Sequence, residues 1–315
     1  MLPRVAIFVV ACICAPRASD AQEIVADTTF DTRVVRPAYA SSGPRILFDE
    51  AHNNYHTSSG RYRPFAELLT NDGYRITANR LVLSREELAA FDILIIANAR
   101  GVPPRLHGLA FSDAEVAAVV AWVQSGGALL FIADHHPDGS AGRGLARGLG
   151  VDFRGGWLSD TTISVKDSQG GKYPANPGIL VFSRANELLA DHPITAGRNE
   201  SERVNRIMSF TGQSLLGPPG SSILFKPTTN ARDNVPVDPD NAPARREVMS
   251  AAGRVQGLAF TLGRGRVVVL GEAGMLSAQL VPGGRKFGMN VPGIDNRQFA
   301  LNVMHWLSGL LPNSP

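Results

Sequence analysis

The sequence predicts an α/β domain with a mostly parallel sheet, helices on both faces of that sheet and a late β-hairpin. Short apolar runs bounded by turn residues recur along the chain, as expected of buried strands. Helical patterns separate several of these runs, and such strand–helix–strand alternation is typical of a parallel sheet covered on both faces. Two apolar runs near the end are joined by a short turn at Gly263, which favours a hairpin.

The first half of the chain contains the most regular elements. We expect strands at residues 45–48, 74–77, 91–97 and 128–133. Residues 62–72 place Phe65, Leu68 and Leu69 on one helical face, and Gly73 ends that helix. The run at 91–97 is almost wholly apolar, as in a parallel strand that is buried on both faces.

The clearest helix is predicted at residues 112–125. Ser112 and Glu115 have the spacing of a capping box, in which each side chain satisfies a free amide of the first turn. Four valines at helical spacing form its buried stripe, namely Val116, Val119, Val120 and Val123. Gly126 and Gly127 end the helix directly before the next apolar run.

The second half is less regular. We expect strands at residues 179–182, 207–210, 222–225, 255–261 and 266–270, and a closing helix at 296–307. Residues 227–250 are rich in Pro, Asp, Asn and Arg, which predicts a long loop that is either a lid or disordered. Together these elements predict one domain over residues 44–310.

The N-terminus has the pattern of a secretory signal peptide. Arg4 precedes an apolar core at residues 5–14, and the small residues around Asp20 offer a cleavage site before Gln22. We therefore expect a signal peptide at 1–21, a polar tether at 22–43, and a mature protein that is periplasmic or secreted. The apolar core is too short to span a bilayer, and a lipoprotein anchored at Cys12 is the alternative.

Composition excludes several classes of function. Both cysteines, Cys12 and Cys14, lie in the predicted signal, so the mature chain would have no disulfide, thiolate metal site or cysteine nucleophile. The net charge of the full chain is +3. Its arginines are scattered among acidic residues without a basic run, which gives nucleic-acid binding little support.

Polar residues follow four of the predicted strands. Ligands bind beyond the carboxyl ends of strands in open α/β sheets, so these residues define the candidate site. In chain order they are Asp49, His52, Asn53 and His56, then Asn98, then Asp134, His135 and His136, and finally Glu272. Four of the seven histidines lie in two of these loops, which is the strongest functional signal in the chain.

One hypothesis is a metal-dependent hydrolase. Histidine and carboxylate are the usual ligands of zinc and similar divalent ions, and a catalytic zinc takes three of them. Asp49, His52 and His135 would bind the metal, with Glu272 as a further ligand. Asp134 and His136 would then serve as acid or base.

Two other hypotheses need no metal. Asn53, His56, Asn98 and Glu272 could bind a small polar ligand such as a carbohydrate, because carboxylates accept hydrogen bonds while amides and neutral histidines do both. Aromatic lining would come from Tyr55, Phe111 and Trp157. Alternatively, the polar cluster only organises loops, as a helix-capping Asp49 would, and the protein is an interaction module of the cell envelope.

The chain resembles the class I glutamine-amidotransferase-like superfamily, in particular its trehalose-utilisation-like branch. The resemblance covers roughly residues 44 to 308 and rests on "ILFDEAHNN", "FDILIIANA", "FSDAEVAAVVAWVQSGGALLFIADHH", "DHPIT" and "VVVLGEAGM". It implies a flavodoxin-like three-layer sandwich with a site at the turn after a strand. In amidotransferases this turn carries a cysteine nucleophile. Here it holds Asp134 and His135, and no His-x-Glu pair follows, so glutaminase activity is not expected.

Overall fold

The computed structural model describes residues 24–40, 42–101, 108–165, 176–238 and 245–313. Residues 1–23 lie outside these ranges, and so do the predicted signal peptide and both cysteines. Within the described parts, no helix combines the length and the apolar character that crossing a membrane would need.

A seven-stranded, mostly parallel sheet forms the centre of this mixed α/β structure. Its strand order is β12-β15-β16-β5-β4-β2-β3. The parallel strands are β2 (Arg45–Asp49), β3 (Arg75–Asn79), β4 (Ile93–Ala97), β5 (Ala128–Ile132) and β16 (Gly265–Leu270). An antiparallel extension consists of β15 (Gly257–Leu262) and β12 (Ser222–Phe225). The predicted strands of this sheet and the late hairpin are present, and the arrangement is consistent with a flavodoxin-like α/β fold.

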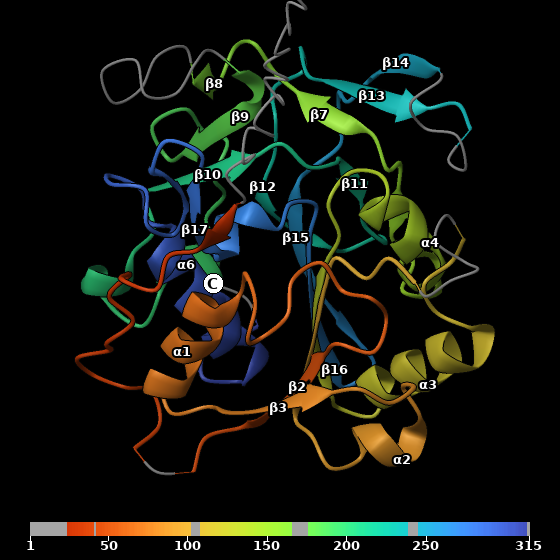
Figure 1. Ribbon diagram of the computed structural model, residues 1–315, viewed down its shortest axis with the longest axis vertical. Coiled ribbons are helices and arrows are strands. Elements are labelled where there is room, and N and C mark those ends of the chain that lie inside the picture. The colour runs from red at the N-terminus through yellow and green to blue at the C-terminus, as the bar shows by residue number, and fades with distance from the viewer. Residues whose placement is uncertain (1–23, 41, 102–107, 166–175, 239–244, 314–315) are drawn as a thin grey trace, which may run out of the picture.

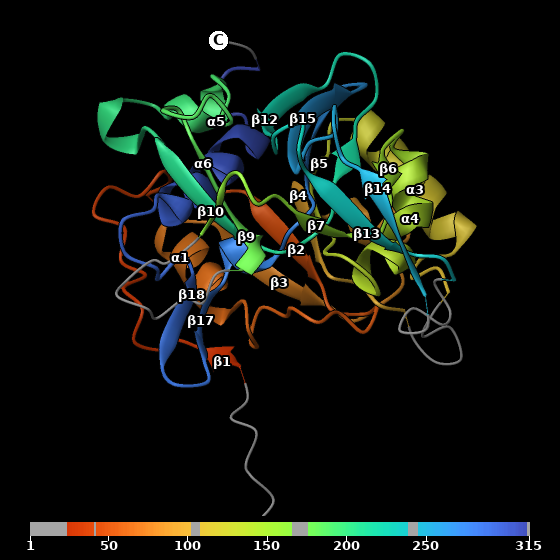
Figure 2. The same cartoon turned by 90° about the horizontal axis from the view of Figure 1, so that it is seen from above.

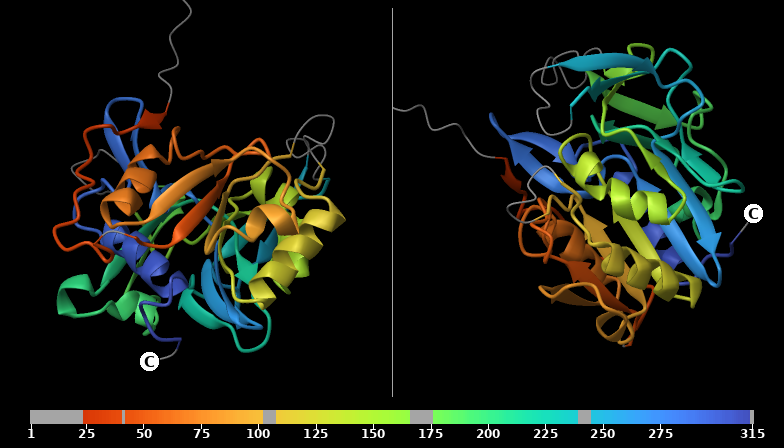
Figure 3. Two further views of the ribbon diagram at one scale, coloured as in Figure 1. Left: turned by 90° about the horizontal axis from the view of Figure 1, so that it is seen from below. Right: turned by 90° about the vertical axis from the view of Figure 1, so that its right-hand side faces the viewer.

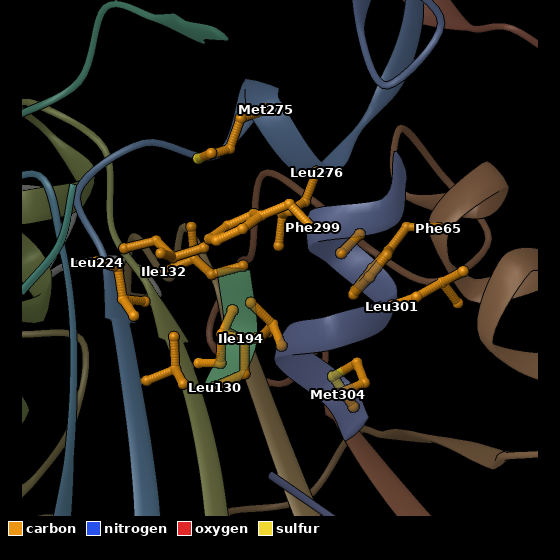
Figure 4. Close-up of a cluster of buried hydrophobic side chains, with 14 of the residues drawn as sticks. Phe65, Leu130, Ile132, Ile194, Leu224, Met275, Leu276, Phe299, Leu301 and Met304 are labelled. Carbon is orange, nitrogen blue, oxygen red and sulfur yellow. The ribbon is translucent and has the colours of Figure 1, made fainter. Parts of the chain in front are cut away.

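Helices pack against both faces of this sheet because its side chains alternate between them. Phe48 and Leu130 belong to a core that includes residues of α1 (Arg63–Asn71) and α6 (Asn296–Leu307). Figure 4 shows Leu130 and Ile132 facing Phe299 of α6. Sheet residues whose side chains point to the other face, such as Leu129, pack in a second core with α3 (Asp113–Gln124) and α4 (Asp138–Gly148). Figure 1 shows the two helix pairs on opposite sides of the sheet.

The start of α3 confirms the predicted capping box. The Ser112 hydroxyl accepts from the Glu115 backbone N–H, and the Glu115 carboxylate accepts from the Ser112 N–H at 2.9 Å. The short helix α2 (Arg85–Leu88) precedes this region and is capped by Ser84 in the same way at its N-terminus. Local sequence therefore fixes where α3 begins.

Residues 227–250 do not form one long loop. They contain β13 (Arg232–Pro236) and β14 (Arg246–Ser250), which pair with each other and, through β13, with β7 (Trp157–Ser159). Figure 2 shows these three strands together, away from the central sheet. Pro, Asp and Asn are poor strand formers, so composition alone predicted a loop. The buried Asp233 carboxylate accepts hydrogen bonds from Ser214 and Arg154, and these bonds offset the cost of burying an acidic residue in strand β13.

Three smaller sheets complete the fold. Strand β9 (Asn176–Ser183) pairs with β10 (Arg206–Phe210) and β8 (Ser164–Val165). Strand β6 (Asp152–Phe153) pairs with β11 (Leu215–Leu216). The hairpin β17 (Ala278–Val281) and β18 (Arg285–Gly288) forms the third. The short helix α5 (Pro193–Ala196) packs against α6.

The predicted polar tether at 22–43 contacts the domain near β1 and at Ala38 and Tyr39, while residues such as Val35 are exposed. Strand β1 (Val25–Ala26) pairs with β17, as Figure 3 shows for the red strand beside the blue hairpin. The Tyr39 ring packs edge-on against Tyr74, and the Ala38 N–H donates to the buried Asp72 carboxylate at 2.7 Å. The segment is polar and irregular, but buried polar partners fix it in place.

Candidate functional site

A pocket of about 230 Å³ lies at the carboxyl ends of β2, β4, β5 and β16. The walls come from the loops after these strands, from Ile24 before β1, from the start of α4, and from β10, β17 and β18. Its lining residues are Ile24, Tyr55, His56, Asn98, Arg100, Asp134, His135, Asp138, Phe210, Glu272, Gly274, Gln279 and Phe287. The pocket therefore joins the ends of four parallel strands, which is where α/β sheets bind ligands.

Asn98 connects three of the loops around the pocket. It follows β4 with a backbone φ of 51°, a left-handed conformation that Asn tolerates better than most residues. Its backbone N–H donates to the Ile132 carbonyl, and its own carbonyl accepts from the Tyr55 N–H. Its side-chain oxygen accepts from the Asp134 N–H at 2.9 Å. The residue therefore sets the position of Asp134.

Gln213 fixes the turn that follows β5 and carries Asp134. Its amide nitrogen donates to the carbonyls of Ala133 and Asp134, at 2.9 and 3.1 Å. Its amide oxygen accepts from the Gly155 N–H at 2.8 Å. Because Gln213 is fully buried and bonded at both ends, it locks the β5 turn against the segment before β7.

Two acidic side chains face the pocket together. Both Glu272 oxygens accept backbone N–H groups at the short 3₁₀ turn Gly274–Leu276, and the Asp134 carboxylate accepts the His135 N–H at 3.1 Å. Burial and the nearby charge of Asp134 raise the pKa of Glu272 well above its ordinary value, and burial also raises the pKa of Asp134. Two neighbouring carboxylates cannot both ionise cheaply, so the pair retains a proton at a pH where isolated acids have lost theirs.

Close backbone approach makes this pair possible. Gly212 lies beside Glu272 with a φ of 115°, and an added Cβ would come within 2.7 Å of the Glu272 Cβ. Glycine is needed there for both the conformation and the space. A larger residue would push the Glu272 loop away from the pocket.

Asp138 and Arg100 form an ion pair on the other wall. The Arg100 Nε donates to the Asp138 carboxylate at 2.7 Å, and Asp138 is buried at the start of α4. Burial raises the pKa of Asp138 to about 6, although Arg100 acts in the opposite direction. The Arg100 guanidinium also lies 4.0 Å from the centre of the Tyr55 ring. The positive charge of Arg100 is therefore already compensated by Asp138 before any ligand binds.

His56 is buried in the pocket wall as a neutral imidazole. Burial, together with the charges of Arg61 and Arg100, lowers its pKa to about 3. The ring packs against Tyr62, with ring centres 4.5 Å apart. Among the described residues none offers a hydrogen-bond partner to His56 Nδ1, and a buried polar atom without a partner is costly unless a ligand or water supplies one.

The two adjacent histidines of the β5 turn have different surroundings. His135 lines the pocket, stacks on Trp157 at 4.8 Å, and donates from Nδ1 to the His136 carbonyl at 2.7 Å. As a neutral imidazole it would then present Nε2 as an acceptor. His136 does not line the pocket, and its Nδ1 lies 3.1 Å from the Ser140 hydroxyl.

Asp49 and His52 belong to a separate buried network. His52 Nδ1 lies 2.9 Å from both Asp49 oxygens, and Nε2 lies 2.9 Å from a Glu115 oxygen. Burial disfavours the charged ring, but bonds to Asp49 and Glu115 raise the pKa of His52 above its ordinary value. With both nitrogens donating to carboxylates, His52 has no lone pair left for a metal. We call this set the His52 network, defined as Asp49, His52 and Glu115.

The structure therefore divides the nine residues predicted for the site. Five line the pocket, namely His56, Asn98, Asp134, His135 and Glu272. Asp49 bonds to His52, which bonds to Glu115, while His136 lies beside Trp157 and Asn53 is exposed. The predicted metal set of Asp49, His52 and His135 is not brought together. No group of three or more His, Cys, Asp or Glu side chains within the described ranges is arranged to hold a metal ion.

Sequence reasoning missed several residues that form the pocket. Arg100 follows Asn98 by two positions, so a longer reading of that loop would have included it. Phe210, Gln279 and Phe287 come from the irregular second half, and no local pattern connects them to the strand ends. Of the predicted aromatic lining, Tyr55 lines the pocket, whereas Phe111 packs on His52 and Trp157 stacks on His135.

Comparison with protein-family models and with curated protein sequences found no match. Among solved structures, the mmIFT52 N-terminal domain matches with a TM-score of 0.57 and 14% identity, over 84% of this chain and 97% of that domain. A cytoplasmic protein from Salmonella typhimurium LT2 matches with a TM-score of 0.44 and 15% identity, over 84% of this chain and 98% of that one.

A protein from Parabacteroides merdae, described as thua-like, matches with a TM-score of 0.44 and 13% identity. That match covers 85% of this chain and 90% of the other. At these identities a likeness concerns the fold and not the reaction. The solved structures that are similar to this chain thus include thua-like proteins.

Proposed function

We propose that the chain is an exported, flavodoxin-like three-layer protein of the amidotransferase-like type that binds a small, neutral, hydroxyl-rich molecule, such as a carbohydrate, without a cysteine nucleophile. One observation carries the proposal. A pocket at the strand ends combines a proton-sharing acid pair, Asp134 and Glu272, with a buried neutral His56 whose Nδ1 has no partner among the described residues.

The charge of the pocket favours a neutral ligand. Asp138 is matched by Arg100, so neither is free to attract an ion. Burial raises the pKa of both acids, and the charge of Asp134 raises that of Glu272 further, which reduces the negative charge that a cation would need. An anionic ligand would meet the remaining carboxylate. A neutral ligand avoids both penalties.

The hydrogen-bonding groups suit hydroxyls. A hydroxyl donates one bond and accepts others, so its partners must include both donors and acceptors. A protonated carboxyl donates, an ionised carboxyl accepts, and the neutral ring of His56 does both. The aromatic pair Phe210 and Phe287, with ring centres 4.1 Å apart, supplies apolar surface for the carbon face of a ring.

The size of the pocket limits the ligand. Drug-sized molecules occupy pockets of roughly 300–1,000 Å³. At about 230 Å³ this pocket is below that range, which favours a monosaccharide, a polyol or one terminal sugar unit of a longer chain. A metal-dependent hydrolase built on Asp49, His52 and His135 is the less favoured function, because these donors lie in different parts of the described structure.

The test is calorimetric titration of the purified chain with a panel of neutral monosaccharides and polyols. We expect saturable binding of at least one compound, and about a tenfold weaker affinity for Asp134→Asn, since a bond to a charged group contributes about 1.5 kcal/mol or more. Asp113→Asn, an exposed carboxylate on α3, is the matched control and should bind as the wild type does. No saturable binding by any compound, or unchanged affinity in Asp134→Asn, would contradict the proposal.

A further inference from the structure

A second pocket, of about 170 Å³, lies on the α6 side of the molecule and shares no lining residue with the first. Four separate segments form it: residues 33–36 before β2, Asp72 directly after α1, residues 198–202 after α5, and one side of α6. Four of its lining side chains are arginines, namely Arg33, Arg36, Arg198 and Arg297. We call it the arginine pocket.

The acidic residues of the arginine pocket are already engaged. Glu202 accepts three bonds from the Arg198 guanidinium, at 2.6 to 3.0 Å. Asp72 is fully buried and accepts from His305 Nε2 and from the Ala38 N–H, both at 2.7 Å. Four arginines against these two carboxylates leave the lining with a net charge of +2 when His305 is neutral.

Arg297, like Arg36, forms no ion pair with a described carboxylate, although Asp31 and Asp72 lie close enough to favour its charged form. It is half-buried in the first turn of α6, and its guanidinium donates to the Arg33 carbonyl at 2.7 Å. Within the described residues no carboxylate lies within ion-pairing distance of it. One neutral acceptor leaves four of the five guanidinium N–H donors available, and a desolvated cation without a counter-charge is unfavourable.

The other donors converge from different segments. Arg36 reaches across to the Ser201 hydroxyl at 3.5 Å, which brings the 33–36 segment against the one that carries Arg198. Guanidinium groups are planar forks that bind phosphate oxygens two at a time. Several forks around a volume too small for a large molecule fit a single tetrahedral oxyanion.

We propose that the arginine pocket is an anion site that takes inorganic phosphate, or the phosphate group of a small molecule, between Arg36, Arg198 and Arg297. The anion supplies the counter-charge that Arg297 lacks and accepts the N–H groups that no carboxylate uses. This site is independent of the proposed carbohydrate pocket, where the lining disfavours anions.

The test is calorimetric titration of the full chain with inorganic phosphate at neutral pH and constant ionic strength, with chloride as the reference salt. We expect about one phosphate per chain. Arg297→Gln and Arg36→Gln should each weaken binding about tenfold or more, since bonds between charged groups are the strong ones. Arg206→Gln removes one exposed positive charge outside the pocket, and it should leave the affinity within about twofold of wild type, as expected for a rim charge that is screened by salt.

The outcomes separate a built site from a general charge effect. No saturable binding by the wild type overturns the proposal, and so does an unchanged affinity in Arg297→Gln. Equal losses of phosphate affinity in Arg206→Gln and Arg297→Gln would show that the phosphate is an adventitious ion only, and would overturn the proposal. Arg297→Lys keeps the charge but not the fork. If Arg297→Gln fails to fold, Arg297→Lys should still weaken phosphate binding, and full affinity in it would overturn the role given to Arg297.

Discussion

The His52 network and the pocket pair Asp134–Glu272 have similar sequence patterns and opposite chemistry. Both place carboxylates directly after a strand of the central sheet. In the His52 network a cationic ring lies between two carboxylates and bonds to both, at 2.9 Å. In the pocket two buried carboxyls share one lining, and His56 Nδ1 has no partner among the described residues. The first set is complete without a ligand and the second is not.

The difference arises from one residue on another element. Glu115 reaches the His52 ring because the capping box fixes it in the first turn of α3. Among the described residues no side chain forms an ion pair with Asp134 or Glu272, whose hydrogen-bond donors are backbone amides, although the nearby His135 favours the charged form of Asp134. Polar residues after a strand therefore stabilise the fold when a counter-charge arrives, and remain available for a ligand when none does.

The largest effect should come from opening the His52 network. His52→Ala leaves Asp49 and Glu115 buried without their counter-charge, which typically costs roughly 3–5 kcal/mol. We expect a loss of that size in the free energy of unfolding, measured by urea denaturation. Asn53→Gly changes the exposed next residue, whose φ of 52° suits glycine, and should stay within about 0.5 kcal/mol of wild type. A loss below about 1 kcal/mol in His52→Ala would show that the network contributes little.

The next effect concerns the pH dependence of stability. Asp134 and Glu272 have pKa values raised above 3.8 and 4.5, so folding favours their protonated forms. Their contribution to stability is fully present below those ordinary values and is lost as the pH rises through the folded-state values. Wild type should therefore lose stability more steeply from pH 5 to pH 8 than Asp134→Asn, in which the repulsion is absent.

Urea denaturation at several pH values checks this sign. Asp113→Asn, whose carboxylate is exposed, should keep the wild-type slope. The difference between variants removes the contribution of His52, whose pKa shift does not depend on Asp134, whereas the pKa of Asp138 falls slightly in Asp134→Asn because the charge of Asp134 helps to raise it. Parallel stability curves for wild type and Asp134→Asn would mean that the two pocket carboxyls do not share a proton.

The smallest effect lies at the rim of the pocket. The Arg246 guanidinium is 3.9 Å from the centre of the Trp157 ring, whose partner is His135. Arg246→Ala should lower the free energy of unfolding by about 0.5–1 kcal/mol, the range of an exposed cation–π contact. Arg245→Ala, also exposed, should change it less, and both can be compared by thermal unfolding. A loss of several kcal/mol would show that the β7–β13–β14 sheet is essential to the whole domain.

The central sheet could be predicted because its signals are local. The apolar runs, the Ser112 capping box and the glycine stops gave β4, β5, α3 and α6 within one or two residues. Strands β13 and β14 could not be predicted, since they depend on the buried contacts of Asp233 with residues far away in sequence. For the same reason the strand-end rule located the pocket region but could not separate Asp49 and His52 from Asp134.

The geometry at Asn98 suggests how relatives with the same chemistry could be found. Its left-handed backbone disfavours branched and bulky side chains, and its amide must also accept the Asp134 N–H. Only asparagine and aspartate meet both conditions readily, because glycine lacks the acceptor. An Asn or Asp at this strand end, with an acid at the next strand end and a glutamate two residues after the hairpin, makes a sparse three-position signature. Chains of this fold that contain this signature would be grouped with this one even where overall sequence identity is low.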